Sequence, residues 1–246
     1  MNTKLKIYAM IPARIGSSRL KFKNFALINN NPLIYYAINA AKESGICSKV
    51  FINSDDKIFN ELANRYNVDF YLRDKELGSS IAKSDEVVAD FISNQPKFDI
   101  LIWVNSIAPL MRSSHIKETL NYFLENDLDS LITSENKNVH ANFLKDPINY
   151  KKDEIFAQTQ DLEPIELFNY CIMMWKTDSF MNAYKKNDFG LMSGKFKTYS
   201  LDDIDVIIKT ASDLKLAEKI IISRKDKNID VSYDKSLNLN HKGELY

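Results

Sequence analysis

The chain has 246 residues, of which 45% are hydrophobic, so it is long enough to bury the core of one complete domain. Lysine and arginine together number 33, as do aspartate and glutamate, and the formal net charge at pH 7 is zero. Such a balanced chain lacks the overall positive charge that nonspecific binding to nucleic acid or to an anionic membrane requires, and we expect neither partner.

The first half of the chain alternates between strand-like and helix-like segments. Short runs rich in Ile, Val and Leu predict buried strands over residues 6–11, 49–53, 100–105 and 130–133. Amphipathic runs between them predict helices over residues 32–44, 57–66, 84–93 and 114–125. Repeated strand–helix units predict a mainly parallel sheet with helices on both faces.

Residues 135–200 break this alternation. A polar, weakly patterned segment precedes the apolar residues 167–169 and 171–175, which we interpret as added strands. A helix follows around Asp213, and residues 224–246 are polar and charged. We therefore expect a single domain over residues 1–223 and a loosely packed tail over residues 224–246.

The two cysteines and the N-terminus indicate the compartment. Cys47 and Cys171 show neither the spacing of metal ligands nor a disulfide framework, as is typical of the reducing cytoplasm. The N-terminal lysines precede only a short apolar run, which we interpret as a first strand rather than as a signal peptide. No stretch is long enough to span a bilayer. We expect a cytoplasmic protein.

The loop that follows the first predicted strand is the strongest functional feature. Its cations are Arg14, Arg19, Lys21 and Lys23. These side chains can neutralise oxyanions, while Gly16, Ser17 and Ser18 allow backbone N–H groups to approach closely. The loop therefore suits a polyphosphate. The alternative is a solvated basic turn, because the loop lacks the glycine-rich pattern of a P-loop.

Polar residues at later strand ends point to the same place. In sheets of this kind, ligands collect at the carboxyl ends of the strands. The cationic loop, residues 53–56 and residues 105–112 would all emerge there. Asn105 and Ser106 end an otherwise apolar strand, which favours a role in lining a site.

Residues 13–34 resemble the signature of the cytidylyltransferases that activate acidic sugars, the CMP-sialic acid and CMP-KDO synthetase group. That signature is Ala-Arg-x-Gly-Ser-x-Arg/Lys, then Lys-Asn, then an apolar helix opened here by Pro32-Leu33-Ile34. Further similar segments follow in the family's order: Asn53-Ser54-Asp55-Asp56, Arg73 with Glu76-Leu77, Pro109-Leu110-Met111-Arg112, Gln160-Asp161-Leu162-Glu163-Pro164 and Asp213-Leu214-Lys215-Leu216-Ala217-Glu218. The resemblance spans roughly residues 6 to 222, and its collinearity makes it specific.

This resemblance implies a fold. The expected architecture is a three-layer α/β/α domain with a mainly parallel, Rossmann-like sheet of the nucleotide-diphospho-sugar transferase type. It also implies that residues 135–200 contain an inserted arm that builds a homodimer and reaches toward the partner's active site. The alternative interpretation of the same segment is an ordinary surface hairpin.

The resemblance also implies site residues. The nucleotide-binding positions are Ala13, Arg14, Gly16, Ser17, Ser18, Arg19, Lys23, Asn24, Arg73 and Ser84. The substrate-binding positions are Asn105, Ser106, Gln160 and Asp161, and we assign catalytic roles to Arg14, Lys23 and Lys209. Arg73 and Ser84 fall where the family reads the pyrimidine. The alternatives are a surface arginine at position 73 and a helix N-cap at position 84.

The expected metal is Mg²⁺. Asp203 and Asp205 place two carboxylates at strand spacing and resemble the family's Asp-Ile-Asp, although acidic pairs near turns are often only solvated. Counting back from Asp213, however, the family would place its aspartates at Ile207 and Lys209. Either a short insertion separates the pair from the last helix, or the pair is shifted and a lysine has entered the site.

The second option resembles another enzyme, the cytidylyltransferase of the methylerythritol pathway. Its Ile-Lys-x-Thr segment is close to Ile208-Lys209-Thr210 but one residue longer. A lysine there would suit an acceptor that bears its own phosphate.

These features predict an enzyme that transfers CMP from CTP to an acidic, sialic-acid-like 2-keto-3-deoxy sugar and releases pyrophosphate. One alternative is a cytidylyltransferase that acts on a small phosphorylated acceptor. Another is a nucleotide-binding homologue that has lost transfer activity.

Overall fold

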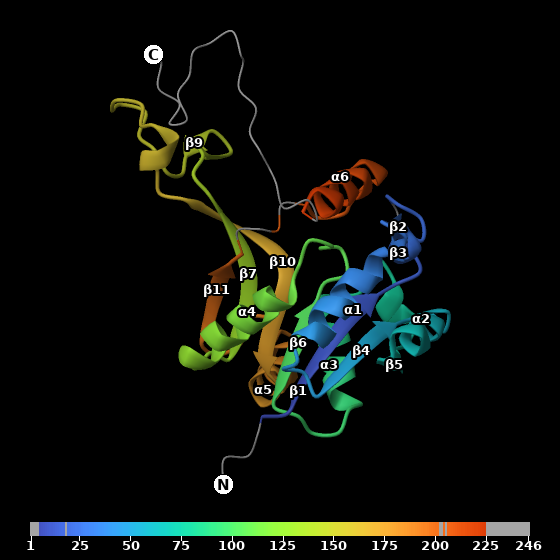
Figure 1. The fold of residues 1–246 in the computed structure, drawn as a ribbon. Helices are drawn as coiled ribbons and strands as arrows, with labels where there is room; N and C mark the ends of the chain where they lie inside the picture. The colour runs from blue at the N-terminus through green and yellow to red at the C-terminus, as the bar shows by residue number, and fades with distance from the viewer. Residues whose placement is uncertain (1–4, 18, 202–203, 205, 225–246) are drawn as a thin grey trace.

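A seven-stranded sheet forms the centre of the molecule in the computed structural model, which describes residues 5–17, 19–201, 204 and 206–224 (Figure 1). The strand order is β11-β7-β10-β6-β1-β4-β5. The strands are β1 (Ile7–Ala13), β4 (Lys49–Ser54), β5 (Asp69–Leu72), β6 (Ile100–Val104), β7 (Ser130–Lys137), β10 (Ile165–Lys176) and β11 (Phe196–Ser200). Neighbouring strands are parallel except at β10, which runs antiparallel to both β6 and β7.

Helices cover both faces of this sheet. They are α1 (Leu33–Glu43), α2 (Phe59–Tyr66), α3 (Ser84–Ser93), α4 (Ser113–Glu125), α5 (Thr177–Asn187) and α6 (Ala211–Ser223). One core cluster joins the sheet to α1, α2 and α4 through Ile34, Phe59 and Ile116. A second cluster joins the opposite face to α3 and α5 through Phe91 and Phe180. The predicted three-layer α/β/α fold is thereby confirmed.

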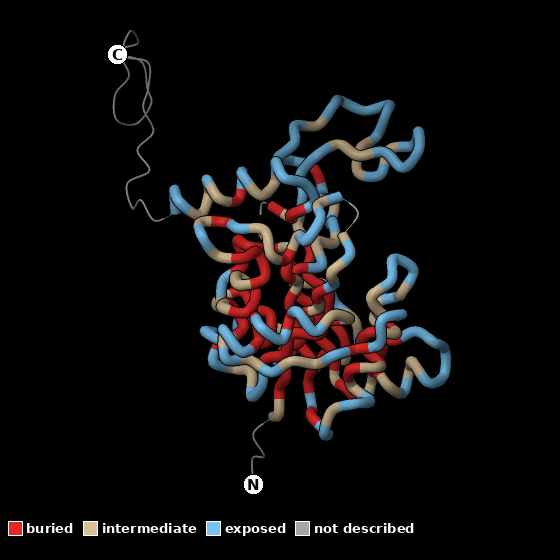
Figure 2. Tube along the Cα trace, turned by 90° about the vertical axis from the view of Figure 1, so that its right-hand side faces the viewer, coloured by how far each residue is buried: buried red, intermediate tan, exposed pale blue. Residues whose placement is uncertain are grey.

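The remaining short elements lie outside this sheet. β2 (Leu27–Ile28) and β3 (Asn31–Pro32) form a two-stranded sheet, and α6 packs on it in a third core cluster that includes Ile28 and Ala217. Single turns of 3-10 helix occur as η1 (Lys23–Phe25), η2 (Glu76–Gly78) and η3 (Thr159–Asp161). The buried residues concentrate in the central sheet and the helix faces that cover it (Figure 2).

The sequence pattern explains why the central elements form. β1 and β6 are almost continuously apolar, as expected for strands that are covered on both faces. The apolar face predicted for the first helix is buried throughout in α1. This helix is followed by Gly45 at a φ of 65°, a left-handed conformation that glycine adopts without steric cost.

Residues 138–164, which we call the projecting segment, extend away from the sheet (Figure 1). The segment holds η3 and a two-stranded sheet of β8 (Asn142–Phe143) and β9 (Asp146–Pro147). It lies within residues 135–200, the range predicted to contain an arm; in the rest of that range, β10 and β11 belong to the central sheet and α5 covers it. The two strands expected at 167–169 and 171–175 form one strand, β10, whose pairing with β7 is irregular between Phe168 and Met173.

Two further predictions concern the C-terminal tail and membrane-spanning helices. The tail lies outside the described residues, apart from Arg224 at the end of α6. Among the helices that the structure describes, none combines the length and the apolar character needed to cross a membrane.

Candidate active site

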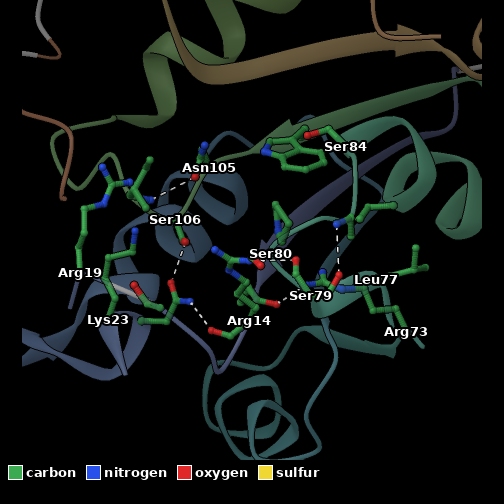
Figure 3. A pocket seen from close by; sticks show the side chains of 18 residues that line it. Arg14, Arg19, Lys23, Arg73, Leu77, Ser79, Ser80, Ser84, Asn105 and Ser106 are labelled. Carbon is green, nitrogen blue, oxygen red and sulfur yellow. Dashed lines mark hydrogen bonds between the residues drawn. The ribbon is translucent and has the colours of Figure 1, made fainter. Parts of the chain in front are cut away.

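A cavity of about 380 Å³ opens at the carboxyl ends of β1 and β6 (Figure 3). Its described lining residues are Pro12, Ala13, Arg14, Ser17, Arg19, Lys23, Asn24, Arg73, Leu77, Ser79, Ser80, Ala82, Ser84, Val87, Trp103, Asn105, Ser106 and Ile107. The volume falls in the range of small-molecule sites, and the position is the one where α/β sheets bind ligands. The cavity therefore brings together most of the predicted site residues.

The two ends of the cavity differ in charge. Arg19 and Lys23 lie at one end, and Leu77 and Ser84 lie toward the other (Figure 3). Across the described lining there are four cationic side chains and no aspartate or glutamate. The cationic end therefore suits an anion. The other end is partly apolar, and although Arg73 lies toward it, the Arg73 guanidinium already donates to oxygens of Asn53 and Ala13, so this end suits an uncharged group.

Lys23 shows how strongly the cations interact. Burial lowers the pKa of Lys23 below the ordinary lysine value, and repulsion by Arg19 and Arg14 lowers it further. Its ammonium donates a hydrogen bond to the Ile208 carbonyl at 3.4 Å, a neutral acceptor that does not offset this repulsion. A bound polyanion would relieve the repulsion between the three cations.

Arg14 links two loops at the cavity. Its guanidinium donates a hydrogen bond to the backbone carbonyl of Ser79 at 3.0 Å. The loop after β1 is thereby joined to the loop that leads into α3. Arg14 itself is exposed, which leaves its charge accessible to a ligand.

Asn24 and Ser106 hold the cationic loop in place. The hydroxyl of Ser106 donates to the Asn24 side-chain oxygen at 2.8 Å, and the Asn24 amide donates to the Arg14 carbonyl at 3.5 Å. Both side chains are buried. The predicted nucleotide-binding Asn24 therefore fixes the backbone of Arg14 to the turn after β6.

Asn105 lies where β6 meets β10. Its amide nitrogen donates to the Tyr170 carbonyl at 3.3 Å, and its side-chain oxygen accepts from the Ile107 N–H at 3.4 Å. These bonds orient the side chain at the rim of the cavity, between its two ends (Figure 3).

Arg73 is deeply embedded, so the surface-arginine alternative is wrong: the residue is 6% exposed. Its guanidinium donates to the backbone and side-chain oxygens of Asn53, both at 2.9 Å, and to the Ala13 carbonyl at 2.9 Å. The carboxylate of Asp55 lies 3.8 Å away. Burial lowers the pKa of Arg73, but a guanidinium stays charged. Arg73 thus ties the ends of β1 and β4 beneath the cavity.

Ser84 is the first residue of α3, and Lys83 occupies the N-cap position that the alternative gave to Ser84. The cap is closed by the Glu86 carboxylate, which accepts from the Lys83 backbone N–H at 2.8 Å. Ser84 is therefore available to line the cavity, as predicted.

Sequence reasoning missed part of the lining. Ser79, Ser80 and Ala82 follow η2, and this run of small residues directly before a helix was the available signal. Nothing in the sequence pointed to Trp103, because an aromatic residue inside an apolar strand is expected to pack in the hydrophobic core.

Some predicted residues do not line the cavity. Gly16 lies in the cationic loop but outside the lining, and Ser18 lies outside the described residues. Gln160 and Asp161 belong to η3 on the projecting segment, away from the cavity of their own chain.

The predicted metal ligands, Asp203 and Asp205, lie outside the described residues. Their described neighbours Leu201 and Ile204 are assigned to no strand. Within the described part of the chain, no group of three or more His, Cys, Asp or Glu side chains could hold a metal ion.

Lys209 does not line the cavity either, but the backbone before it lies close by. The Ile208 N–H donates to the carbonyl of Ile107, a lining residue, at 2.9 Å. The Lys209 N–H donates to the Asp213 carboxylate at 2.8 Å, at the start of α6. The backbone segment that leads from the two predicted aspartates to α6 therefore runs beside the cationic end of the cavity.

A three-layer α/β fold with a cationic cavity at its strand ends is the arrangement of nucleotide-binding α/β proteins. A family model described as cytidylyltransferase matches residues 8–186. The chain belongs to the cytidylyltransferase family, which confirms the resemblance seen in its motifs.

Two curated relatives and one solved structure are similar to this chain. The N-acylneuraminate cytidylyltransferase of Streptococcus agalactiae serotype V is 28% identical over 72% of this chain and 45% of its own length. The pseudaminic acid cytidylyltransferase of Campylobacter jejuni is 34% identical over 50% of this chain and 55% of its own length. The chain thus spans about half the length of these relatives. The CMP:2-keto-3-deoxy-manno-octonic acid synthetase structure, solved with CTP, superposes with a TM-score of 0.69 at 14% identity, over 89% of this chain and 99% of that one, and so shares its fold.

Proposed function

We propose that the protein transfers CMP from CTP to a sialic-acid-like 2-keto-3-deoxy sugar and releases pyrophosphate. The observation that carries this proposal is the cavity, whose described lining contains Arg14, Arg19 and Lys23 and no aspartate or glutamate, with a partly apolar end around Leu77 and Ser84 away from Arg19 and Lys23. The names of the two relatives, which both act on acidic sugars, support the acceptor class.

The residues of the cavity have different roles in this proposed reaction. Arg14, Arg19 and Lys23 hold the triphosphate and stabilise the pyrophosphate as it leaves. An acceptor hydroxyl oxygen bonds to the α-phosphorus, the bond from that phosphorus to the bridging oxygen of the pyrophosphate breaks, and the hydroxyl proton passes to solvent. Asn105 stands at the rim, where the acceptor would enter.

Magnesium is part of the proposal. Asp203 and Asp205 offer the hard oxygen ligands that Mg²⁺ prefers, and Ile208, three positions beyond, lies beside the cationic end. When bound, the ion would neutralise part of the triphosphate charge. Asp203→Asn and Asp205→Asn should each abolish Mg²⁺-dependent turnover. Retained activity in both variants, together with loss in Lys209→Ala, would instead favour the lysine-containing site.

We also propose a homodimer built through the projecting segment. This segment exposes large apolar side chains, including Leu144 at 86% and Ile155 at 97%. In a dimer, Gln160 and Asp161 could serve the partner's cavity, which would explain why they lie away from their own. Light scattering should give twice the chain mass, and Ile155→Asp should shift it toward the monomer.

The proximity of Lys209 to the cationic end supports a second candidate function, a cytidylyltransferase for a small phosphorylated acceptor. The two candidates differ in what Lys209→Ala should do. The change should raise the KM of a phosphorylated acceptor and leave that of a sialic-acid-like sugar unchanged.

The deciding experiment measures pyrophosphate release from CTP, UTP, ATP and GTP with a panel of 2-keto-3-deoxy sugar acids and phosphorylated polyols. CTP with a sugar acid should turn over, and purine nucleotides should not. Lys23→Ala should abolish turnover, while Lys21→Ala, in the same loop but outside the cavity lining, is the matched control and should keep it. CTP binding without release with any acceptor would indicate a homologue that has lost transfer activity.

A further inference from the structure

Trp103 carries a polar atom that has no hydrogen-bond partner among the residues that the structure describes. The residue lies within β6, is 8% exposed and lines the cavity. Its indole N–H is buried and has no hydrogen-bond partner in the described structure. Because a buried N–H without a partner costs free energy, its presence at a ligand cavity calls for a functional explanation.

Burial alone does not account for the unused donor. The chain has two tryptophans, and the other, Trp175, is completely buried in the same core cluster. The Trp175 indole N–H donates to the Leu191 carbonyl at 2.8 Å. The fold therefore provides an acceptor for the tryptophan that is purely structural, whereas the described residues provide none for the tryptophan at the cavity.

The packing of Trp103 places it at the partly apolar end of the cavity, near Leu77. It belongs to the core cluster that contains Val87 and against which Leu77 packs. Leu77 lies toward the end opposite Arg19 and Lys23 (Figure 3). With the phosphates of a nucleotide at the cationic end, the nucleoside part would lie near this neutral donor.

We propose that Trp103 determines specificity by donating its indole N–H to an acceptor atom in the nucleoside part of the bound nucleotide. This inference rests on the proposed function, because it takes the ligand to be a nucleotide. The N–H is shielded from solvent in the free protein, so side chains at this end of the cavity, such as Val87, must shift as the nucleoside enters.

Calorimetry on Trp103→Phe tests this assignment with two probes, CTP and inorganic tripolyphosphate. Loss of one neutral hydrogen bond should weaken CTP binding about three- to tenfold. Tripolyphosphate, which lacks a nucleoside, should bind Trp103→Phe and the wild type equally. Trp175→Phe is the matched control, and its CTP affinity should be unchanged.

Fluorescence supplies a second measurement that does not require Trp103 to be replaced. In Trp175→Phe, Trp103 is the sole tryptophan. Its emission should change on addition of CTP or CMP but not on addition of tripolyphosphate. In Trp103→Phe, the emission of Trp175 should respond to neither.

The outcomes separate this inference from the proposed function. If the wild type does not bind CTP, the proposed function fails and this inference fails with it. If the wild type binds CTP but Trp103→Phe binds it equally well, or if tripolyphosphate changes Trp103 emission as much as CTP does, only the role of Trp103 is overturned.

Discussion

Removing the buried Arg73 side chain from the cavity lining should strongly destabilise the protein. The guanidinium donates three hydrogen bonds of 2.9 Å, to Ala13 and to both oxygens of Asn53, and it lies 3.8 Å from Asp55. Hydrogen bonds to a charged group contribute roughly 1.5–3 kcal/mol each, but their losses overlap. Arg73→Ala also leaves Asp55 without its partner, so we expect a total loss of about 3–5 kcal/mol.

Urea denaturation measures this loss directly. Arg73→Lys keeps the charge but not the planar fork of donors, so it should recover only part of the stability. Arg65→Ala, at an exposed position of α2, is the matched control and should stay within about 0.5 kcal/mol of the wild type. An Arg73→Ala variant as stable as this control would refute the view that Arg73 holds the strand ends together.

Arg14, Lys23 and Asp213 each carry a charge whose role can be measured. Arg14→Ala should weaken CTP binding by roughly 1.5–3 kcal/mol in calorimetry while the fold survives, and unchanged affinity would exclude the cationic loop as the triphosphate site. Because the pKa of Lys23 is lowered by burial and then by Arg19, CTP affinity should fall as the pH rises through that lowered pKa. Arg19→Ala should move the fall to higher pH, and a Lys23→Ala variant with the wild-type pH dependence would contradict this. The backbone N–H groups of Lys209 and, second, Thr210 donate to the Asp213 carboxylate and lower its pKa in the folded protein. The charged carboxylate therefore stabilises the fold at pH values above the pKa that Asp213 has in the unfolded chain. This stabilisation is lost as the pH falls through the pKa that Asp213 has in the folded protein. Asp213→Ala should cost about 0.3–1 kcal/mol in urea denaturation near neutral pH, and a gap that does not narrow in acid would count against this role.

Elements with a strong apolar pattern were predictable from the sequence. β1, β4, β6 and α1 bury nearly all their apolar residues, and their observed bounds lie within two residues of those predicted. β5, α5 and β11 were missed. β5 and β11 lie at the edges of the sheet and contain no fully buried residue, so their patterns resemble those of loops.

The cavity was predictable only in part, because side-chain partners depend on tertiary contacts. The cationic loop identified Arg14, Arg19 and Lys23, since charges that gather after a strand are visible in the sequence. The fixing of Arg73 by the ends of β1 and β4 was not visible, because it joins residues far apart in the chain. The unpaired donor of Trp103 could be found only once the neighbours of β6 were known.

A crystal structure of the protein with CTP tests the central claim most directly. The account predicts phosphates against Arg19 and Lys23, with the nucleoside at the end lined by Leu77, Ser84 and Trp103. CTP bound with its phosphates at the Leu77 end, or bound away from this cavity, would contradict it.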